Sequence, residues 1–150
     1  MNVKALVGAG DRVMGLALPF IVVGIAANLF WPPVFRMGFA ARGIFAGIVL
    51  LVVGLPLWLT SVAQVLIVVP KSKLITSGPY ALMLHPLYTS VALLVFPAIG
   101  LLVDTWLGFA LGAVLYLSSR LFSPAEERAL AESFGAEYVA YRAKVLFPWL

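Results

Sequence analysis

Four long apolar runs separated by polar stretches dominate the pattern of hydrophobic and polar positions along the chain. The runs cover about residues 13–30, 43–69, 86–103 and 105–121. A helix rises ~1.5 Å per residue, so runs of this length suit the ~30 Å hydrocarbon core of a bilayer. The second run is longer than one crossing needs, and tilt or a bend at Pro56 would absorb the excess. The pattern predicts an all-α membrane protein with about four transmembrane helices.

The composition indicates the same class of protein. Hydrophobic residues occupy 63% of the 150 positions, charged residues occupy 11%, and the mean hydropathy is +1.09. A soluble domain carries roughly 25% charged residues, so this chain has too little polar surface to cover itself in water. We expect one integral membrane domain over residues 1–150. The first apolar run continues to Trp31 and further runs follow, so we expect a retained helix and not a cleaved signal peptide.

Residue counts also exclude several kinds of chemistry. Cysteine is absent, which excludes disulfides, a thiolate nucleophile and cysteine-ligated metal. Histidine occurs once, at His85, and we expect no metal site. The net charge of +4 would suggest nucleic acid as a partner of a soluble protein. Here we attribute the charge to orientation in a membrane, and we expect the lipid bilayer, and not nucleic acid, as the partner.

Lysine and arginine are unevenly divided between the two sides that four spans would create. The stretch between the first and second runs holds two arginines, Arg36 and Arg42. The N-terminus, the central loop and the C-terminus together hold the other eight: Lys4, Arg12, Lys71, Lys73, Arg120, Arg128, Arg142 and Lys144. Positive residues favour the cytoplasmic side of a membrane. Both termini and the central loop are therefore predicted to be cytoplasmic.

Two polar stretches interrupt the apolar pattern, and we expect them to fold against each other at one membrane face. The central loop covers residues 70–85, and a C-terminal amphipathic helical segment covers residues 123–147. Ser123 is expected to begin that segment as an N-cap, with Pro124 as the first helical residue and Glu126 completing a capping box. Gly135 is expected to break or bend it.

An apolar and aromatic face runs along the predicted C-terminal segment. Its members recur at helical spacing: Leu130, Phe134, Tyr138, Tyr141 and Val145. Two interpretations remain open. The segment either lies on the membrane surface as an amphipathic helix, or forms a lid over a cytoplasmic pocket.

Several residues in the apolar runs predict how the helices pack. Gly43 with Gly47, and Gly108 with Gly112, form small-residue faces that allow close helix contact. Asp104 is expected to cap the fourth helix after a one-residue hinge. The polar side chain of Gln64 is expected to contact a neighbouring helix.

Two motifs together resemble a known group of membrane enzymes. Gly78-Pro79-Tyr80 followed by His85-Pro86-Leu87-Tyr88 resembles a G-P-Y…R-H-P-x-Y segment. The later residues Glu126-Glu127-x-x-Leu130-x-x-x-Phe134-Gly135-x-x-Tyr138-x-x-Tyr141 resemble an E-E-x-x-L-x-x-x-F-G-x-x-Y-x-x-Y segment. Both segments are features of the isoprenylcysteine carboxyl methyltransferase and phospholipid methyltransferase superfamily, which the chain resembles over roughly residues 43–148. Leu84 and Leu146 stand where that group has, or often has, arginine.

The resemblance implies an S-adenosylmethionine-dependent methyltransferase with a hydrophobic or membrane-embedded acceptor. Carboxylates suit the donor's ammonium group or ribose hydroxyls, and tyrosine rings can hold its sulfonium by cation–π attraction. A glycine in the first motif permits close backbone approach. The candidate cofactor-binding residues are Gly78, Tyr80, His85, Tyr88, Glu126, Glu127, Tyr138 and Tyr141.

Two residues are candidates for a catalytic role. His85 is a candidate to bind the donor's carboxylate, or to act as general base for an amine or thiol acceptor. Arg120 is a candidate to hold a carboxylate. Purely structural alternatives stay open: His85 as a helix cap, Glu126 as part of the capping box, and the tyrosines as interfacial anchors.

Two other functions also stay open. One is a nicotinamide-dependent membrane reductase, although no phosphate-cradling glycine loop is present. The other is a membrane scaffold or subunit whose site has decayed, which Leu84 would favour. The acceptor remains open among prenylated carboxylates, lipid amines, isoprenoid lipids and small thiols, and so does the oligomeric state.

Overall fold

A computed structural model describes residues 3–150, with side chains from residue 12 onward except at residue 40. Residues 1 and 2 of the predicted domain, and the side chain of Lys4, lie outside the described part. The described chain is 80% helical and contains no strand. Its elements are α1 (Val3–Phe30), α2 (Pro32–Phe35), α3 (Ala40–Val68), the 3₁₀ turn η1 (Val69–Lys71), α4 (Pro79–Leu82), α5 (Pro86–Ser90), the π-helical turn η2 (Val91–Val95), α6 (Phe96–Leu102), α7 (Leu107–Phe134) and α8 (Ala136–Arg142).

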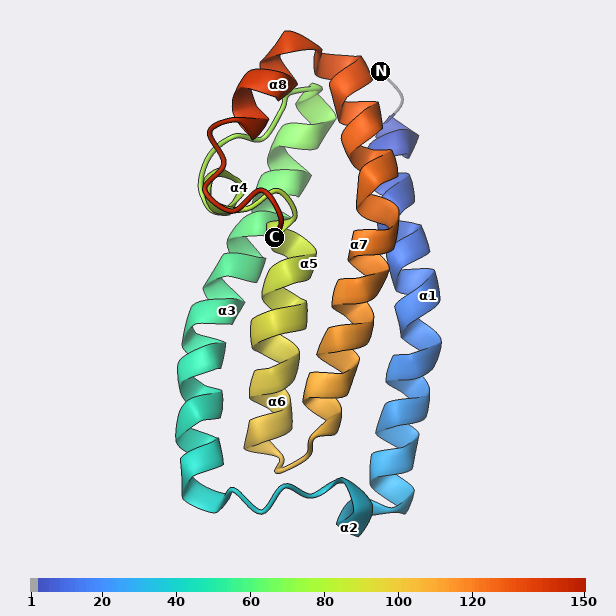
Figure 1. Cartoon of the computed structure of the whole chain (residues 1–150), viewed down its shortest axis with the longest axis vertical. Helices are drawn as coiled ribbons and strands as arrows, with labels where there is room; N and C mark the ends of the chain where they lie inside the picture. Colours follow the sequence, from blue (N-terminus) through green and yellow to red (C-terminus); the bar gives the residue numbers. More distant parts are fainter. Residues whose placement is uncertain (1–2) are drawn as a thin grey trace.

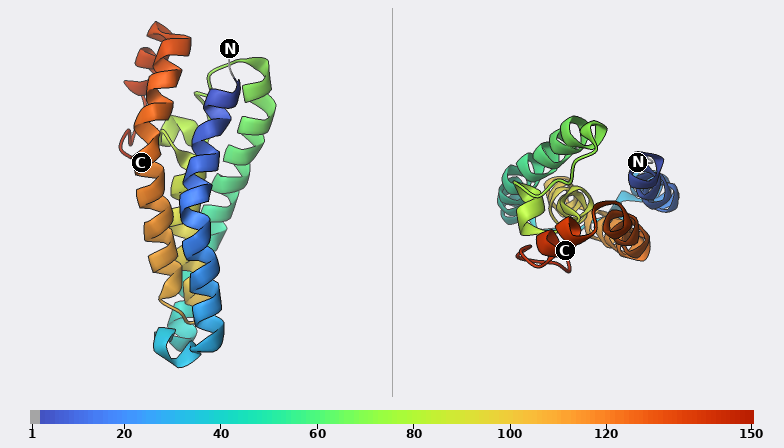
Figure 2. Two further views of the ribbon diagram at one scale, coloured as in Figure 1. Left: turned by 90° about the vertical axis from the view of Figure 1, so that its right-hand side faces the viewer. Right: turned by 90° about the horizontal axis from the view of Figure 1, so that it is seen from above.

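Four helical rods lie side by side and form an elongated bundle (Figure 1). α5, η2 and α6 run end to end as one rod. The π-helical turn ends two residues before Pro97, whose nitrogen has no hydrogen to donate. α1 packs mainly against α7, while α3 packs against the α5–α6 rod, which also contacts α7. Figure 2 shows α1 and α3 on opposite sides of the bundle when it is viewed from its end.

The helices are long and apolar enough for a membrane protein, as the sequence predicts. Among the described residues, three stretches qualify by length and hydropathy: Arg12–Phe30, Ala41–Lys71 and Leu107–Phe134. A shorter apolar rod covers Pro86–Leu102. Large apolar side chains such as Phe45, 72% exposed, point outward, which suits contact with lipid. The predicted class of all-α membrane protein is confirmed, and four crossings remain a prediction.

Glycines bring the rods into backbone contact, which confirms the packing role predicted for the two small-residue faces. A Cβ atom added to Gly47 would lie 3.0 Å from the carbonyl oxygen of Ala98 in α6. One added to Gly108 would lie 2.6 Å from the Cα atom of Gly100, across the α6–α7 contact. Such distances leave no room for a side chain.

α7 continues through the position where the sequence predicts a new helix, so that prediction is wrong. The Ser123 side chain donates to the carbonyl oxygen of Ser119, 2.7 Å away, and caps no helix end. Pro124 lies inside α7 and costs one backbone hydrogen bond there. Packing of α7 against the other rods outweighs that local signal. The helix ends at Gly135, where φ is +51°, so the predicted break at this glycine is confirmed.

The predicted cap at Asp104 is also wrong. Four residues, 103–106, connect α6 to α7, so the hinge is longer than one residue. Oδ1 of Asp104 accepts hydrogen bonds from the backbone N–H groups of Gly38 (2.9 Å) and Phe39 (3.2 Å), just ahead of α3. Oδ2 lies 3.5 Å from Nε of Arg36. Asp104 therefore ties together two connections at one end of the bundle.

The two polar stretches come together at the opposite end of the bundle. The central loop with α4, and the C-terminal residues with α8, lie side by side there, and the start of α1 lies toward the same end (Figure 1). The expectation that the two stretches fold against each other is therefore confirmed. Placement of this end in the cytoplasm remains a prediction.

Single-cysteine labelling tests that sidedness without background, because the native chain has no cysteine. We expect Lys71→Cys, in the central loop, to react with a membrane-impermeant maleimide only after the cell is opened. Val34→Cys, at the other end of the bundle, should react with intact cells. The reverse pattern would overturn the predicted orientation, and labelling of both from one side would overturn the number of crossings.

Candidate active site

The first motif is shaped by a glycine and held by α3. Gly78 has φ of +60° and precedes Pro79, the first residue of α4. Nε2 of Gln64 in α3 donates to the backbone oxygen (3.2 Å) and the side-chain oxygen (3.3 Å) of Ser77. The sequence predicts that Gln64 contacts a neighbouring helix, whereas in the structure it contacts the motif loop.

The C-terminal residues hold the same loop from its other side. The backbone N–H of Phe147 donates to the carbonyl oxygen of Leu82 at 2.8 Å. The carbonyl oxygen of Leu150 accepts from the N–H groups of Leu84 (2.9 Å) and His85 (3.2 Å). The backbone that carries His85 is thus held by hydrogen bonds just before α5 begins. Its side chain makes no cap hydrogen bond, so the capping alternative for His85 is wrong.

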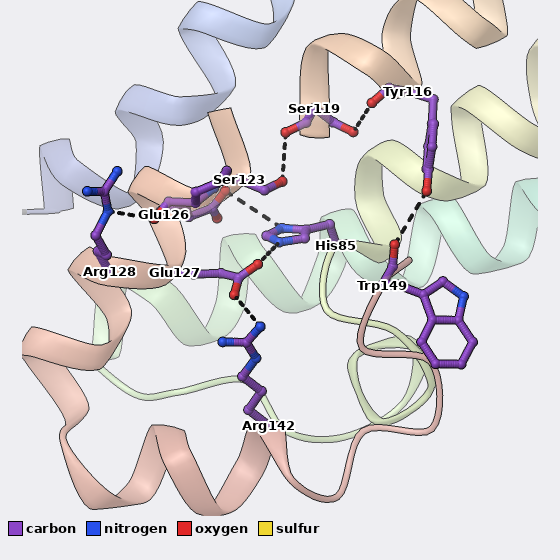
Figure 3. A network of polar contacts seen from close by, with 10 residues as sticks. His85, Tyr116, Ser119, Ser123, Glu126, Glu127, Arg128, Arg142 and Trp149 are labelled. Carbon is purple, nitrogen blue, oxygen red and sulfur yellow. Dashed lines mark hydrogen bonds and ion pairs between the residues drawn. The ribbon is translucent and has the colours of Figure 1, made fainter. Parts of the chain in front are cut away.

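A polar network joins α5, α7 and α8 around His85 (Figure 3). Nε2 of His85 lies 3.4 Å from Oε1 of Glu127, and Nδ1 lies 3.8 Å from Oε2 of Glu126. Oε2 of Glu127 lies 3.2 Å from Nη2 of Arg142, the last residue of α8. The His85 side chain is only 6% exposed. Because α7 continues through this region, Glu126 lies mid-helix and its predicted capping role is wrong.

A cavity of about 240 Å³ opens beside this network. It is somewhat smaller than the ~300–1,000 Å³ that is usual for ligand sites. Its walls come from the end of α3, the central loop, α4, α5, α7 and α8. The lining residues are Val65, Val69, Lys73, Leu74, Ile75, Tyr80, Leu84, His85, Leu87, Tyr88, Glu126, Leu130, Phe134, Tyr138 and Tyr141.

Three tyrosines of the cavity are kept neutral by their surroundings. Burial first, and then the negative charge of Glu127, raises the pKa of Tyr138 to about 12. Burial likewise raises the pKa of Tyr80 and of Tyr141. The Tyr141 hydroxyl donates to the backbone oxygen of Tyr80 at 2.8 Å. These side chains offer aromatic faces and hydroxyl donors, and they are unsuited to act as phenolate bases near neutral pH.

The aromatic face of the C-terminal segment turns inward over the cavity. Tyr138 and Tyr141 are 3% and 8% exposed, and they pack with Leu84 and Val145. Of the two interpretations for this segment, the structure favours the lid. Interfacial anchoring is correspondingly excluded for Tyr138 and Tyr141.

The structure brings most of the predicted site residues to the cavity. Six of the candidates line it: Tyr80, His85, Tyr88, Glu126, Tyr138 and Tyr141. The other three candidates do not line the cavity. Gly78 contacts Gln64, Glu127 holds His85, and Nη1 of Arg120 is buried without a hydrogen-bond partner among the described residues.

Sequence reasoning missed the contacts made by Arg142, by Leu84 and by the backbone of Leu150. Arg142 and Glu127 belong to different helices, and no helical spacing predicts their contact. Leu84 is buried against two tyrosines. The leucine therefore has a packing role at the position where the family pattern has arginine. The hydrogen bonds of the Leu150 carbonyl involve only backbone and leave no side-chain signal.

Gly78 offers a specific test of the loop's shape. A Cβ atom there would lie 3.0 Å from Nε2 of Gln64 and would also require φ of +60°. Gly135 has a similar φ of +51° but nothing within 4 Å of the added atom. We expect both alanine substitutions to cost about 1 kcal/mol of unfolding free energy through backbone strain. Gly78→Ala alone should also weaken ligand binding in the cavity, because it displaces the motif loop. Thermal unfolding in detergent and titration calorimetry measure the two effects, and equal binding by both variants would contradict this account.

Comparison with known proteins agrees with the site. Residues 68–137 match the family model described as phospholipid methyltransferase, and this segment, a little under half of the chain, carries His85, Glu126 and Glu127. No curated protein and no solved structure matches the chain. The match supports a membrane methyltransferase. This segment is similar to the phospholipid methyltransferase family, which belongs to the isoprenylcysteine carboxyl methyltransferase-like superfamily.

Proposed function

We propose that the protein transfers a methyl group from S-adenosylmethionine to a hydrophobic or membrane-embedded acceptor at the membrane interface. One observation carries the proposal. The two motifs that resemble the family, though far apart in sequence, line one cavity at a single end of an apolar helical bundle. The family's methyltransferases generally use this donor. No observation favours the reductase or the decayed scaffold.

The residues at the cavity fit the chemical groups of the donor. Glu126 presents a carboxylate that suits an ammonium group or ribose hydroxyls. The rings of Tyr80, Tyr88 and Tyr138 suit a sulfonium, at ~0.5–2 kcal/mol for each cation–π contact. Nη1 of Arg120 is a buried donor without a partner in the described chain. Arg120 does not line the cavity, and its positive charge acts on the site through Glu127.

When bound, the donor would supply an electrophilic methyl group. The chain's own contribution is to position the reactants and to exclude water. Leu130 and Phe134 give one wall of the cavity an apolar surface, and α8 covers it. His85, held by Glu127, is placed to accept a proton at Nδ1 from an amine or thiol acceptor. An ionised carboxylate acceptor would need no base.

The apolar side of the cavity supports an acceptor that resides in the bilayer. Val65 comes from the end of α3, Val69 from the following turn η1, and Leu87 from the start of α5. Both rods are otherwise part of the apolar bundle. A polar donor entering from water and a hydrophobic acceptor entering from lipid would meet at this level of the protein. We propose a membrane lipid or a lipid-modified group as the acceptor.

Titration calorimetry with S-adenosylhomocysteine, the demethylated donor, tests the proposal. We expect micromolar binding by the detergent-purified protein and no measurable binding by His85→Ala/Glu127→Ala. Excess NADPH should not compete. Displacement by NADPH would instead favour the reductase, and absence of binding to a well-folded sample would favour the decayed scaffold.

A further inference from the structure

Arg142 lies outside the cavity yet is joined to it through two other side chains. It is the last residue of α8, with a side chain that is 53% exposed. Its Nη2 atom lies 3.2 Å from Oε2 of Glu127, whose other oxygen lies 3.4 Å from Nε2 of His85. Arg142 does not line the cavity, whereas His85 does. Figure 3 shows the three side chains in sequence, with Glu127 in the middle.

Each oxygen of the Glu127 carboxylate contacts a different partner, and the two contacts together fix the orientation of the carboxylate. A carboxylate held at only one oxygen can rotate about its last side-chain bond, because that torsion has a broad energy profile. With Arg142 on Oε2, Oε1 is directed at His85. Glu127 is 15% exposed, so little water is present to replace a lost partner. The arginine therefore orients the group that orients the histidine.

The orientation of Glu127 also determines which nitrogen of His85 carries a hydrogen. An ionised carboxylate only accepts hydrogen bonds, so the contact with Glu127 requires a hydrogen on Nε2. Nδ1 is then the ring atom at which a proton is exchanged. It faces Glu126, a cavity residue, at 3.8 Å. Two further cations face the cluster: Arg120, whose positive charge acts on Glu127, and Lys73, which lines the cavity.

We propose that Arg142 is a positioning residue: through Glu127 it holds His85 as the Nε2–H form, with Nδ1 directed to the cavity. The functional part rests on the proposed donor binding, whereas the structural part does not. The Arg142 side chain is 53% exposed and Glu127 keeps its contact with His85, so loss of the ion pair with the arginine should cost little folding stability. Removal of Arg142 should therefore leave the fold intact and weaken the hold on the Nε2 hydrogen of His85.

The single histidine makes this proposal directly measurable. Protein labelled with ¹⁵N-histidine gives NMR signals from His85 alone, because the chain has no other histidine. We expect the native protein to show a hydrogen on Nε2 that exchanges slowly with water. Arg142→Ala should raise that exchange rate at least about tenfold and weaken S-adenosylhomocysteine binding about tenfold, as expected for loss of one charge-assisted contact. For Arg142→Lys, which keeps the charge, we expect an exchange rate and an affinity between those of the native protein and of Arg142→Ala.

Two controls separate positioning from general effects of charge or folding. Arg128 is an exposed arginine on α7, and within the described part of the chain its Nε donates to the carbonyl oxygen of Pro124 in the same helix, at 3.1 Å. Arg128→Ala should leave both the exchange rate and the affinity unchanged. In a Glu127→Gln background, Arg142→Ala should add no further change in the His85 signals, because the arginine acts through Glu127.

The outcomes distinguish failure of this proposal from failure of the proposed function. Unchanged His85 signals in both Arg142 variants would overturn the positioning role, whatever happens to affinity. If the native protein binds S-adenosylhomocysteine, changed His85 signals with unchanged affinity would overturn its link to binding. If the native protein does not bind it, the NMR result alone decides the positioning role, and the proposed function fails separately.

Discussion

Replacing Glu126 by glutamine is expected to weaken binding of S-adenosylhomocysteine by about 10- to 100-fold, the range for a lost hydrogen bond to a charged group. Glu126 lines the cavity and faces Nδ1 of His85, and no lysine or arginine pairs with it among the described residues. Glutamine keeps the size of the side chain but removes the negative charge. Titration calorimetry on the detergent-purified variant measures the change.

Two matched variants make the result interpretable. Glu127→Gln should weaken binding less, because Glu127 lies behind His85 and acts on the cavity through it. Glu132→Gln, at an exposed position of the same helix, should have no effect. If Glu127→Gln caused the larger loss, the assignment of Glu126 as the carboxylate that contacts the donor would be wrong.

Gly108→Ala is expected to have the largest effect on stability, with a cost of about 3 kcal/mol, at the upper end for overpacking a tight contact. The added Cβ atom would lie 2.6 Å from the Cα atom and 2.7 Å from the backbone nitrogen of Gly100. Backbone atoms cannot rotate away as a side chain could, so α6 and α7 must separate. Denaturation of the protein in mixed micelles, followed by circular dichroism, gives the free energy of unfolding.

The same substitution at Gly15 is the control. Gly15 also lies inside a long helix, α1, but an added Cβ atom would meet nothing within 4 Å. Alanine favours the helix over glycine by up to about 1 kcal/mol, so Gly15→Ala should leave the stability unchanged or slightly raised. Equal losses at both positions would contradict the close approach of α6 and α7.

The helical rods, their close contacts and the break near the C-terminus could be predicted from the sequence, because they follow from periodic and compositional signals. The apolar runs predict the rods, and the glycine pairs 43/47 and 108/112 predict their close contacts. Gly135 is predicted to break the C-terminal segment, and its positive φ shows why it does. Each of these signals acts locally or along one helix, where spacing alone carries the information.

The errors arise where tertiary contacts outweigh a local signal. Ser123 and Pro124 form a good helix start in isolation, but α7 continues through them because it packs along its length against other rods. Asp104 has the chemistry of a cap, and it instead accepts hydrogen bonds from Gly38 and Phe39, far away in sequence. Nothing in the local sequence predicts that alternative partner.

For the candidate site too, local sequence signals predict some features, and others depend on tertiary contacts. Residue type and motif order predict that His85, Glu126 and the tyrosines gather at one end of the bundle. They do not predict that adjacent glutamates differ, with Glu126 at the cavity and Glu127 behind His85. That difference depends on how α7 is rotated relative to α5. The Arg142 contact depends on where α8 turns after Gly135.

Methyl transfer in a membrane tests the central claim most directly. The protein would be reconstituted into vesicles made from a total lipid extract, supplied with S-adenosylmethionine labelled in its methyl group, and extracted with organic solvent. We predict label in the lipid fraction for the native protein and for Glu132→Gln, and none above background for Glu126→Gln. Equal label with Glu126→Gln would contradict the assigned site. A native protein that binds S-adenosylhomocysteine but transfers no label to any lipid would contradict a membrane-embedded acceptor.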